Sequence, residues 1–185
     1  MVDLYATRND LLHLLPAHPV IAELGVFEGD FSDEILETCA PAALHLVDLW
    51  TGPMECGDKD GNHIKKLTDE DMQRVFLRLK RKYGRGTSPV VLHRMDVLTA
   101  LASFDDDTFD LVYVDADHSY AAVKSHLEAA ATKVKRGGFL GGHDYGAPYL
   151  GVVKAVNEFA AIRNFEWVAV TTGDGCPSFL LRRPA

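Results

Sequence analysis

The chain has 185 residues, of which 47% are apolar and 25% are charged, and this composition excludes an intrinsically disordered protein. The formal net charge of −8 argues against nucleic acid as a partner, because proteins that bind nucleic acid present a basic surface to the phosphates. The sequence shows no signal peptide, no run near the roughly 18 apolar residues of a membrane span and only three scattered cysteines, so we expect a cytoplasmic protein without disulfides or a membrane partner.

The first half of the chain alternates between amphipathic and apolar segments, which predicts helices and strands in turn. In chain order these are a helix at 4–15, a strand at 18–26, a helix at 31–39, a strand at 43–50, a helix at 68–84, a strand at 89–96 and a helix at 97–104. Pro16 stops the first helix, so residues 1–17 form an N-terminal helical segment. The polar, glycine-rich residues 51–67 predict a long loop, which we expect to act as a lid over a substrate.

The second half of the chain continues this alternation and ends in a hairpin. In chain order it predicts a strand at 109–117, a helix at 120–138, a strand at 139–145, a helix at 151–164 and two strands at 165–172 and 178–183. The turn GDGCP joins the last two strands, which predicts that they pair antiparallel. We therefore expect a single α/β domain over residues 1–185, with a doubly wound, mostly parallel, Rossmann-like sheet and right-handed crossovers.

Polar side chains follow several of the predicted strands at the point where the apolar run stops. The clearest case is DLVYVDADHSY at 110–120, in which two acids and a histidine follow a buried strand. In open α/β sheets, ligands bind outside the carboxyl ends of the strands. The sequence therefore predicts one site at this edge of the sheet, built from Glu23, Gly25, Asp48, Asp96, Asp115, His118, His143 and Asp144.

The segment AELGVFEGDFS at 22–32 combines a strand, a turn with two glycines and the start of a helix. Glycines let the backbone approach a ligand closely, and a helix N-terminus attracts a phosphate or a carboxylate. Asp48 ends the next strand about 20 residues on, where an acid commonly binds ribose hydroxyls, and Asp96 can accept a hydrogen bond from an adenine amino group. Taken singly, each acid also fits a helix cap or a solvated turn, and the dinucleotide fingerprint G-x-G-x-x-G is absent from the sequence.

The sequence resembles a known family in five segments: AELGVFEGDFS, LHLVDLW, FDLVYVDADHSY, GGFLGGHDY and GVVKAVNEF. They resemble class I S-adenosylmethionine-dependent methyltransferases and, among these, the small-molecule O-methyltransferases of the macrocin O-methyltransferase-like group. The resemblance covers roughly residues 18–183. It implies a seven-stranded sheet in which the last strand is antiparallel and lies beside the fifth.

The same resemblance assigns the cofactor site. It implies that Glu23, Gly25 and Gly29 line the methionine part of S-adenosylmethionine, that Asp48 holds its ribose and that Asp96 lies near its adenine. The segment before the first strand is short, whereas helices in this region of the family often build the substrate cover and the oligomer contacts. The methyl acceptor is therefore the feature that the resemblance defines least, and a homodimer is compatible with it.

The other end of the predicted site contains acids and histidines from two neighbouring strands. Asp115, His143 and Asp144 together can bind one divalent cation, for which the carboxylates suit Mg²⁺ and an imidazole widens the choice to Mn²⁺. The resemblance makes His118 the general base, and an imidazole with an ordinary pKa near 6.5 accepts a proton at neutral pH. Asp117 either orients His118 or caps the helix that follows.

These observations predict an enzyme that methylates a hydroxyl group of a small molecule, with a divalent cation that assists deprotonation. A sugar or a sugar-bearing natural product is the first expected acceptor, and a catechol-like phenol is the second. The fourth strand ends in Asp-Ala-Asp-His and not in the Asn-Pro-Pro-aromatic motif of amide and base N-methyltransferases. Three alternatives stay open: a cofactor-binding module without catalysis, a metal-dependent enzyme of another reaction type, and a set of helix caps and polar turns without a site.

Overall fold

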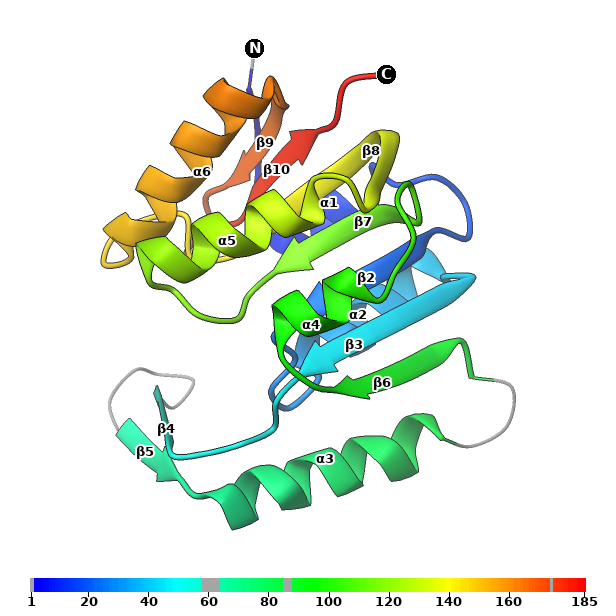
Figure 1. Ribbon diagram of the computed structural model, residues 1–185, viewed down its shortest axis with the longest axis vertical. Coiled ribbons are helices and arrows are strands. Elements are labelled where there is room, and N and C mark those ends of the chain that lie inside the picture. The colour runs from blue at the N-terminus through cyan, green and yellow to red at the C-terminus, as the bar shows by residue number, and fades with distance from the viewer. Residues whose placement is uncertain (1, 58–63, 85–87, 174) are drawn as a thin grey trace.

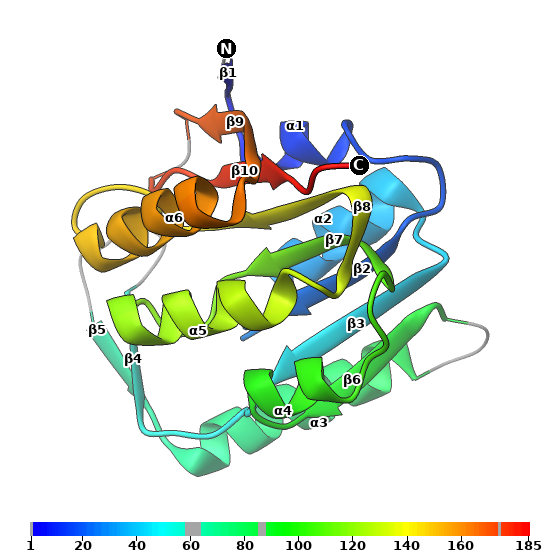
Figure 2. The ribbon, with the colours of Figure 1, turned by 45° about the horizontal axis from the view of Figure 1, so that its top comes forward.

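The computed structural model describes residues 2–57, 64–84, 88–173 and 175–185. It contains an eight-stranded sheet with helices packed on both faces (Figures 1 and 2). In chain order the strands of this sheet are β1 (Asp3–Tyr5), β2 (Val20–Leu24), β3 (Ala43–Asp48), β6 (Val90–Arg94), β7 (Phe109–Val114), β8 (Val134–Gly142), β9 (Glu166–Thr171) and β10 (Phe179–Arg182). Across the sheet they follow the order β1-β9-β10-β8-β7-β2-β3-β6.

Most of this sheet is parallel, which confirms the expected Rossmann-like arrangement. β2 pairs in parallel with both β3 and β7, and β8 continues the parallel sheet beyond β7. β10 lies between β8 and β9 and runs antiparallel to both, as the closing hairpin predicts. Seven strands were expected, and the eighth is β1, which pairs in parallel with β9 at the edge of the sheet.

The helices divide between the two faces of the sheet. One face carries α4 (Val97–Ala102), α5 (Tyr120–Ala130) and α6 (Leu150–Arg163), and the other carries α1 (Arg8–Leu12), α2 (Asp30–Cys39) and α3 (Asp69–Tyr83). Each face of the sheet buries its own apolar cluster. Alternate side chains of β2 point to opposite faces, so Ala22 belongs to the cluster of Leu127 and Ile21 to the cluster of Leu79. Within the described ranges, no helix has the length and apolar character to cross a membrane.

The N-terminal segment differs from the helix predicted for residues 4–15. Residues 3–5 belong to β1, and only Arg8–Leu12 are helical. The Thr7 N–H donates to Asp10 Oδ2 at 2.8 Å, which fixes the point where α1 begins. Leucine spacing alone permits a longer helix, but the pairing of β1 with β9 holds the first residues in the sheet.

The segment 51–67, predicted as a loop, contains two short strands. β4 (Met54–Gly57) and β5 (Ile64–Leu67) pair antiparallel in a separate two-stranded sheet. Residues 58–63, at the centre of the expected lid, lie outside the described residues. Figures 1 and 2 show the two strands beside the start of α3, on the side where the parallel strands end. A lid movement of this segment stays a prediction.

The helix predicted for residues 120–138 ends earlier than expected, at Ala130. The chain turns through a hydrogen bond from the Lys133 N–H to the Ala130 carbonyl, and Val134 then pairs with Phe109 at the start of β8. The glycine pair 137–138, which predicts a helix end, instead lies inside β8, where the register with β7 is irregular. Alanine-rich sequence favours a helix locally, but strand pairing with β7 decides the outcome here.

Two histidines stack on adjacent strands of the main sheet. His45 of β3 and His93 of β6 join their rings by a 2.9 Å hydrogen bond between Nδ1 and Nε2, and the Phe104 ring meets both edge-on. Burial lowers the pKa of both rings, and the neighbouring His93 lowers that of His45 further. The folded state therefore favours two neutral rings. Its stability is lost as the pH falls below the ordinary histidine pKa of about 6.5, because the unfolded state then binds more protons.

We expect His93→Gln to reduce this acid sensitivity, because the variant has one titrating ring fewer. The free energy of unfolding, measured by urea titration, should decline less steeply than in the wild type between about pH 6.5 and pH 5. His13→Gln changes an exposed histidine and should keep the wild-type slope. Identical slopes in His93→Gln and the wild type would contradict the role of the pair.

Candidate functional site

A close contact between two strand ends positions the site. The Asp115 N–H donates to the Leu24 carbonyl at 2.7 Å, so β2 and β7 stay joined at their carboxyl ends. Gly25 follows with a φ of +90°, and a Cβ at this position would lie 2.0 Å from the Asp115 carbonyl oxygen. Only glycine satisfies both requirements. The glycine turn and the segment of acids and histidine therefore lie side by side at one edge of the sheet.

Asp48, at the end of β3, organises the turn that follows Gly25. Its Oδ2 accepts hydrogen bonds from the N–H groups of Val26 and Phe27 at 2.9 Å each, and its Oδ1 accepts from the Trp50 N–H at 2.7 Å. A carboxylate offers about four lone-pair sites, so these bonds leave capacity for a ligand hydroxyl. The structure therefore gives Asp48 a positioning role that the sequence did not indicate, and it leaves the predicted ribose contact open.

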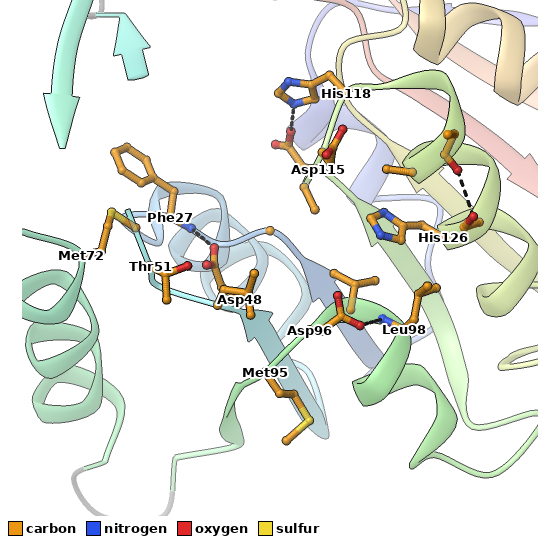
Figure 3. Close-up of a pocket in the computed structure, with 18 residues that line it drawn as sticks. Phe27, Asp48, Thr51, Met72, Met95, Asp96, Leu98, Asp115, His118 and His126 are labelled. Atoms are coloured by element: carbon orange, nitrogen blue, oxygen red, sulfur yellow. Dashed lines mark hydrogen bonds and ion pairs between the residues drawn. The ribbon is translucent and has the colours of Figure 1, made fainter. Parts of the chain in front are cut away.

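A pocket of about 820 Å³ opens where the strand ends meet (Figure 3). Gly25 and Asp48 line one part of it, Asp96 lines a second, and Asp115 with His118 lines a third. Five of the predicted site residues therefore share one cavity although they are distant in the sequence. Its lining combines the carboxylates of Asp48 and Asp96 with a charged end at Asp115 and His118.

Glu23 and Gly29 are not among the residues that line this pocket. Glu23 is 2% exposed and accepts a 2.6 Å hydrogen bond from the Ser32 hydroxyl. Burial raises the pKa of Glu23 to about 8, although the bond from Ser32 opposes the shift. The carboxyl group is therefore mostly protonated at neutral pH. Gly29 has a φ of +85° and packs against α3, where an added Cβ would lie 2.9 Å from Leu79 Cδ2.

Asp115, His118 and Asp144 form the charged end of the site. His118 Nε2 lies 3.7 Å from Asp115 Oδ1 and 2.9 Å from Asp144 Oδ2, and one ligand atom from each residue lies within 4.8 Å of the other two. The carboxylates of Asp115 and Asp144 together raise the pKa of His118 to about 10, against the effect of burial. With no other cation beside it, the imidazole is protonated at neutral pH and has no lone pair with which to accept a proton.

His143 contacts this cluster without being part of its closest group. Its Nδ1 lies 3.2 Å from Asp144 Oδ1, on the other oxygen from the one that faces His118. Burial favours the neutral form of Asp144, but the close contacts with His118 and His143 outweigh it and hold the pKa of Asp144 well below its usual range. The structure thus brings together the two predicted carboxylate ligands, Asp115 and Asp144. The histidine closest to both is His118, which was predicted as the base, and His143, predicted as a ligand, contacts only Asp144 among them.

The donor set at the charged end fits a divalent cation. Two carboxylates suit Mg²⁺ or Mn²⁺, and an imidazole beside them can either complete the ligand set or accept a proton. His118 Nε2 is shielded from solvent and, among the described residues, makes no hydrogen bond of good geometry, although two carboxylates lie close to it. Donor atoms that converge in this way suit a divalent cation. The cation itself stays a prediction.

Two other acids near the pocket accept hydrogen bonds from backbone N–H groups. Asp96 is the N-cap of α4, and its Oδ1 accepts from the N–H groups of Leu98 and Thr99 at 2.9 and 3.0 Å. Asp117 Oδ1 accepts from the Ser119 N–H at 2.6 Å and so forms a turn just before α5. The N-cap of that helix is Ser119, whose hydroxyl accepts from the Ala122 N–H at 3.3 Å, so Asp117 is not the cap itself.

Two further residues lie at the site although the sequence did not single them out. Tyr149, the N-cap of α6, packs its ring against His118 with the centroids 4.7 Å apart. His126 lies on the buried face of α5 with Val123 and Leu127, and it lines the pocket. Helical spacing places His126 on that face, but spacing alone does not separate a ligand-binding histidine from a core histidine.

Comparison with known proteins gives one family. Residues 22–145, more than half of the chain, match a family model described as Methyltransferase domain. No curated protein matches the chain.

Solved structures share the fold at low sequence identity. A protein from Corynebacterium glutamicum is 16% identical and has a TM-score of 0.64, over 98% of this chain and 83% of the other. The N-methyltransferase NodS from Bradyrhizobium japonicum WM9 is 17% identical and has a TM-score of 0.62, over 96% of this chain and 95% of the other. The complex of NodS with S-adenosyl-L-homocysteine has a TM-score of 0.60, over 96% and 86% of the two chains at 17% identity.

We expect Glu23→Gln to stabilise the protein at alkaline pH. The folded state holds Glu23 protonated, so the wild type loses stability as the pH rises from the ordinary glutamate value through about 8, whereas a glutamine has no charge to bury. The melting temperature of Glu23→Gln should exceed that of the wild type at pH 8, by about 2–4 °C for each kcal/mol regained, and the difference should shrink at pH 5. Glu37→Gln, at an exposed position of α2, should show no such trend. A pH-independent difference would contradict the assignment.

Proposed function

The chain belongs to the methyltransferase-domain family, and from this premise we propose that it transfers the methyl group of S-adenosylmethionine to a hydroxyl group of a small molecule. The observation that carries the proposal is the single pocket that joins the glycine turn at Gly25 to Asp115 and His118. Methyl transfer requires the donor methyl group and the acceptor oxygen to be held in line and in contact. A cavity with a nucleoside-type end and a charged end supports such an arrangement.

The cofactor would extend along the pocket from Asp96 to Gly25. Asp48 retains about one lone-pair site for a ribose hydroxyl, and the positive φ of Gly25 lets the backbone approach the ligand without a side chain between them. Glu23 lies directly behind this turn, and the ammonium group of the methionine end would favour its ionised form. The buried, neutral Glu23 is therefore a group whose charge depends on the bound cofactor.

The charged end would prepare the acceptor. A hydroxyl group has a pKa far above 7, so its oxygen becomes a competent nucleophile only when the proton is removed during attack. Asp115 and Asp144 would hold a divalent cation, which, when bound, lowers the pKa of the acceptor hydroxyl. With their charge balanced in this way, the two carboxylates would stabilise the imidazolium less. The Nε2 lone pair of His118 would then be free to accept the hydroxyl proton.

The acid and histidine cluster supports a hydroxyl acceptor. A neutral amine already has a nucleophilic lone pair, whereas a sugar or phenol hydroxyl has to lose its proton during attack, and a base assisted by a cation favours that loss. We place a sugar or a sugar-bearing natural product first, in line with the macrocin O-methyltransferase-like group, and a catechol-like phenol second. The net charge of −8 opposes a nucleic-acid acceptor.

We expect chelation to abolish turnover. With EDTA present, transfer of labelled methyl from S-adenosylmethionine to a panel of sugars and phenols should stop, and Mg²⁺ or Mn²⁺ should restore it, because the acceptor proton is then removable at neutral pH. Asp144→Asn should weaken Mn²⁺ binding, measured by electron paramagnetic resonance. Full methyl transfer in EDTA, or methylation of amines alone, would refute the hydroxyl mechanism and leave the cofactor site in place.

We expect His118→Ala to lower kcat by about 10²–10⁴, because the variant lacks the general base. Affinity for S-adenosyl-L-homocysteine and for Mn²⁺ should stay within about twofold of the wild type, since His118 contacts neither when it acts as a base. His13→Ala, at an exposed position, is the matched control for rate and for fold. Loss of Mn²⁺ binding in His118→Ala would assign His118 as a ligand, and an unchanged rate would remove it from the mechanism.

A further inference from the structure

His126 is a buried polar side chain in the pocket wall that lacks a hydrogen-bond partner at Nδ1. The residue is 7% exposed, and it lines the pocket from α5. Its Nδ1 makes no hydrogen bond with any part of the chain that the structure describes. A buried polar atom left without a partner costs about 1–3 kcal/mol, and native proteins retain few of them. A ligand in the pocket could supply this bond.

The surroundings of His126 suit a flat aromatic group. Met95 lines the pocket from the turn after β6, Val97 and Leu98 line it from the start of α4, and Ala121 and Ala122 line it from α5. Figure 3 shows the His126 ring projecting from α5 into the space beside Asp96 and Leu98. Small and apolar walls of this kind accept the faces of a ring system, while a few placed polar groups bind its edge.

Asp96 offers a second polar group at the same end of the pocket. Its Oδ1 is bound by the N–H groups of Leu98 and Thr99, so Oδ2 is the oxygen that stays available to a ligand. Burial lowers the pKa of His126, although the negative charges of Asp96 and Asp117 oppose the shift. The imidazole is therefore neutral at pH 7 and offers one N–H donor together with one acceptor.

We propose that His126 binds the adenine ring of the cofactor, with a ring N–H of His126 donating to adenine N1 while Asp96 Oδ2 accepts from the N6 amino group. This inference rests on the proposed function and adds a residue to it: the edge of the base is bound by a histidine from α5 as well as by the acid at the end of β6. Rotation of the imidazole about its Cβ–Cγ bond exchanges Nδ1 with Cδ2, so the donor can turn to the base when the cofactor enters.

A chemical double-mutant cycle tests the contact between His126 and N1. Isothermal titration would compare S-adenosyl-L-homocysteine with its 1-deaza analogue, in which N1 is replaced by CH, on the wild type and on His126→Leu. We expect each single change to weaken binding about 10-fold and the two together to weaken it no further, because both remove the same hydrogen bond. His126→Asn, whose amide nitrogen takes the place of Nδ1, should retain binding within about threefold of the wild type.

The outcomes separate this inference from the proposed function. Equal affinity of His126→Leu and the wild type, or losses that multiply in the cycle, would overturn the role of His126 and leave the cofactor assignment intact. Absence of S-adenosyl-L-homocysteine binding by the wild type would overturn both. If His126→Leu does not fold, the analogue decides the question: a loss of about 10-fold on both the wild type and His126→Asn supports the contact, and equal binding of the two ligands by the wild type overturns it. His13→Leu is the exposed control and should bind both ligands as the wild type does.

Discussion

The backbone contact between Gly25 and Asp115 is the constraint on which the site depends. β2 and β7 are neighbours in the sheet, and the bond from the Asp115 N–H to the Leu24 carbonyl holds their ends together. No side chain fits between them, since a Cβ at position 25 would lie 2.0 Å from the Asp115 carbonyl oxygen. A substitution at Gly25 would push the two strand ends apart. The turn proposed for the cofactor and the acids proposed for the acceptor are adjacent because this contact exists.

Burial favours the neutral form of both ionisable groups beside that contact, Glu23 and His118, but their neighbours give each a different outcome. For Glu23 the Ser32 hydroxyl and the charge of Arg8 oppose burial without reversing it, so the carboxyl group favours the neutral form. His118 lies between two carboxylates, so charge dominates and its imidazole favours the protonated form. On the proposed function, each state would change when a ligand arrives, because a cationic methionine end favours ionised Glu23 and a divalent cation weakens the hold of the carboxylates on the His118 proton.

Sequence pattern predicted the features that depend on local and topological rules. Apolar runs that end in acids indicated β2, β3 and β7, and their parallel order brought Asp48, Asp96, Asp115 and His118 into one pocket as expected. The failures have a common cause, which is pairing between distant segments. β1 joins the sheet through β9, and β8 takes residues from a helix-favouring stretch because it pairs with β7. Sequence pattern also did not indicate which histidine lies nearest to both carboxylates: His118 Nε2 faces Asp144 Oδ2, and His143 Nδ1 faces Oδ1.

The central claim is that the donor methyl group and the charged cluster of Asp115, His118 and Asp144 occupy neighbouring parts of one pocket. The most direct test is the ¹³C relaxation of S-adenosylmethionine labelled at its methyl carbon, bound to the protein and titrated with paramagnetic Mn²⁺. The account predicts strong broadening of the methyl signal in the wild type and loss of that broadening in Asp144→Asn. A methyl signal that Mn²⁺ leaves sharp while both ligands are bound would place donor and cation far apart and contradict the account.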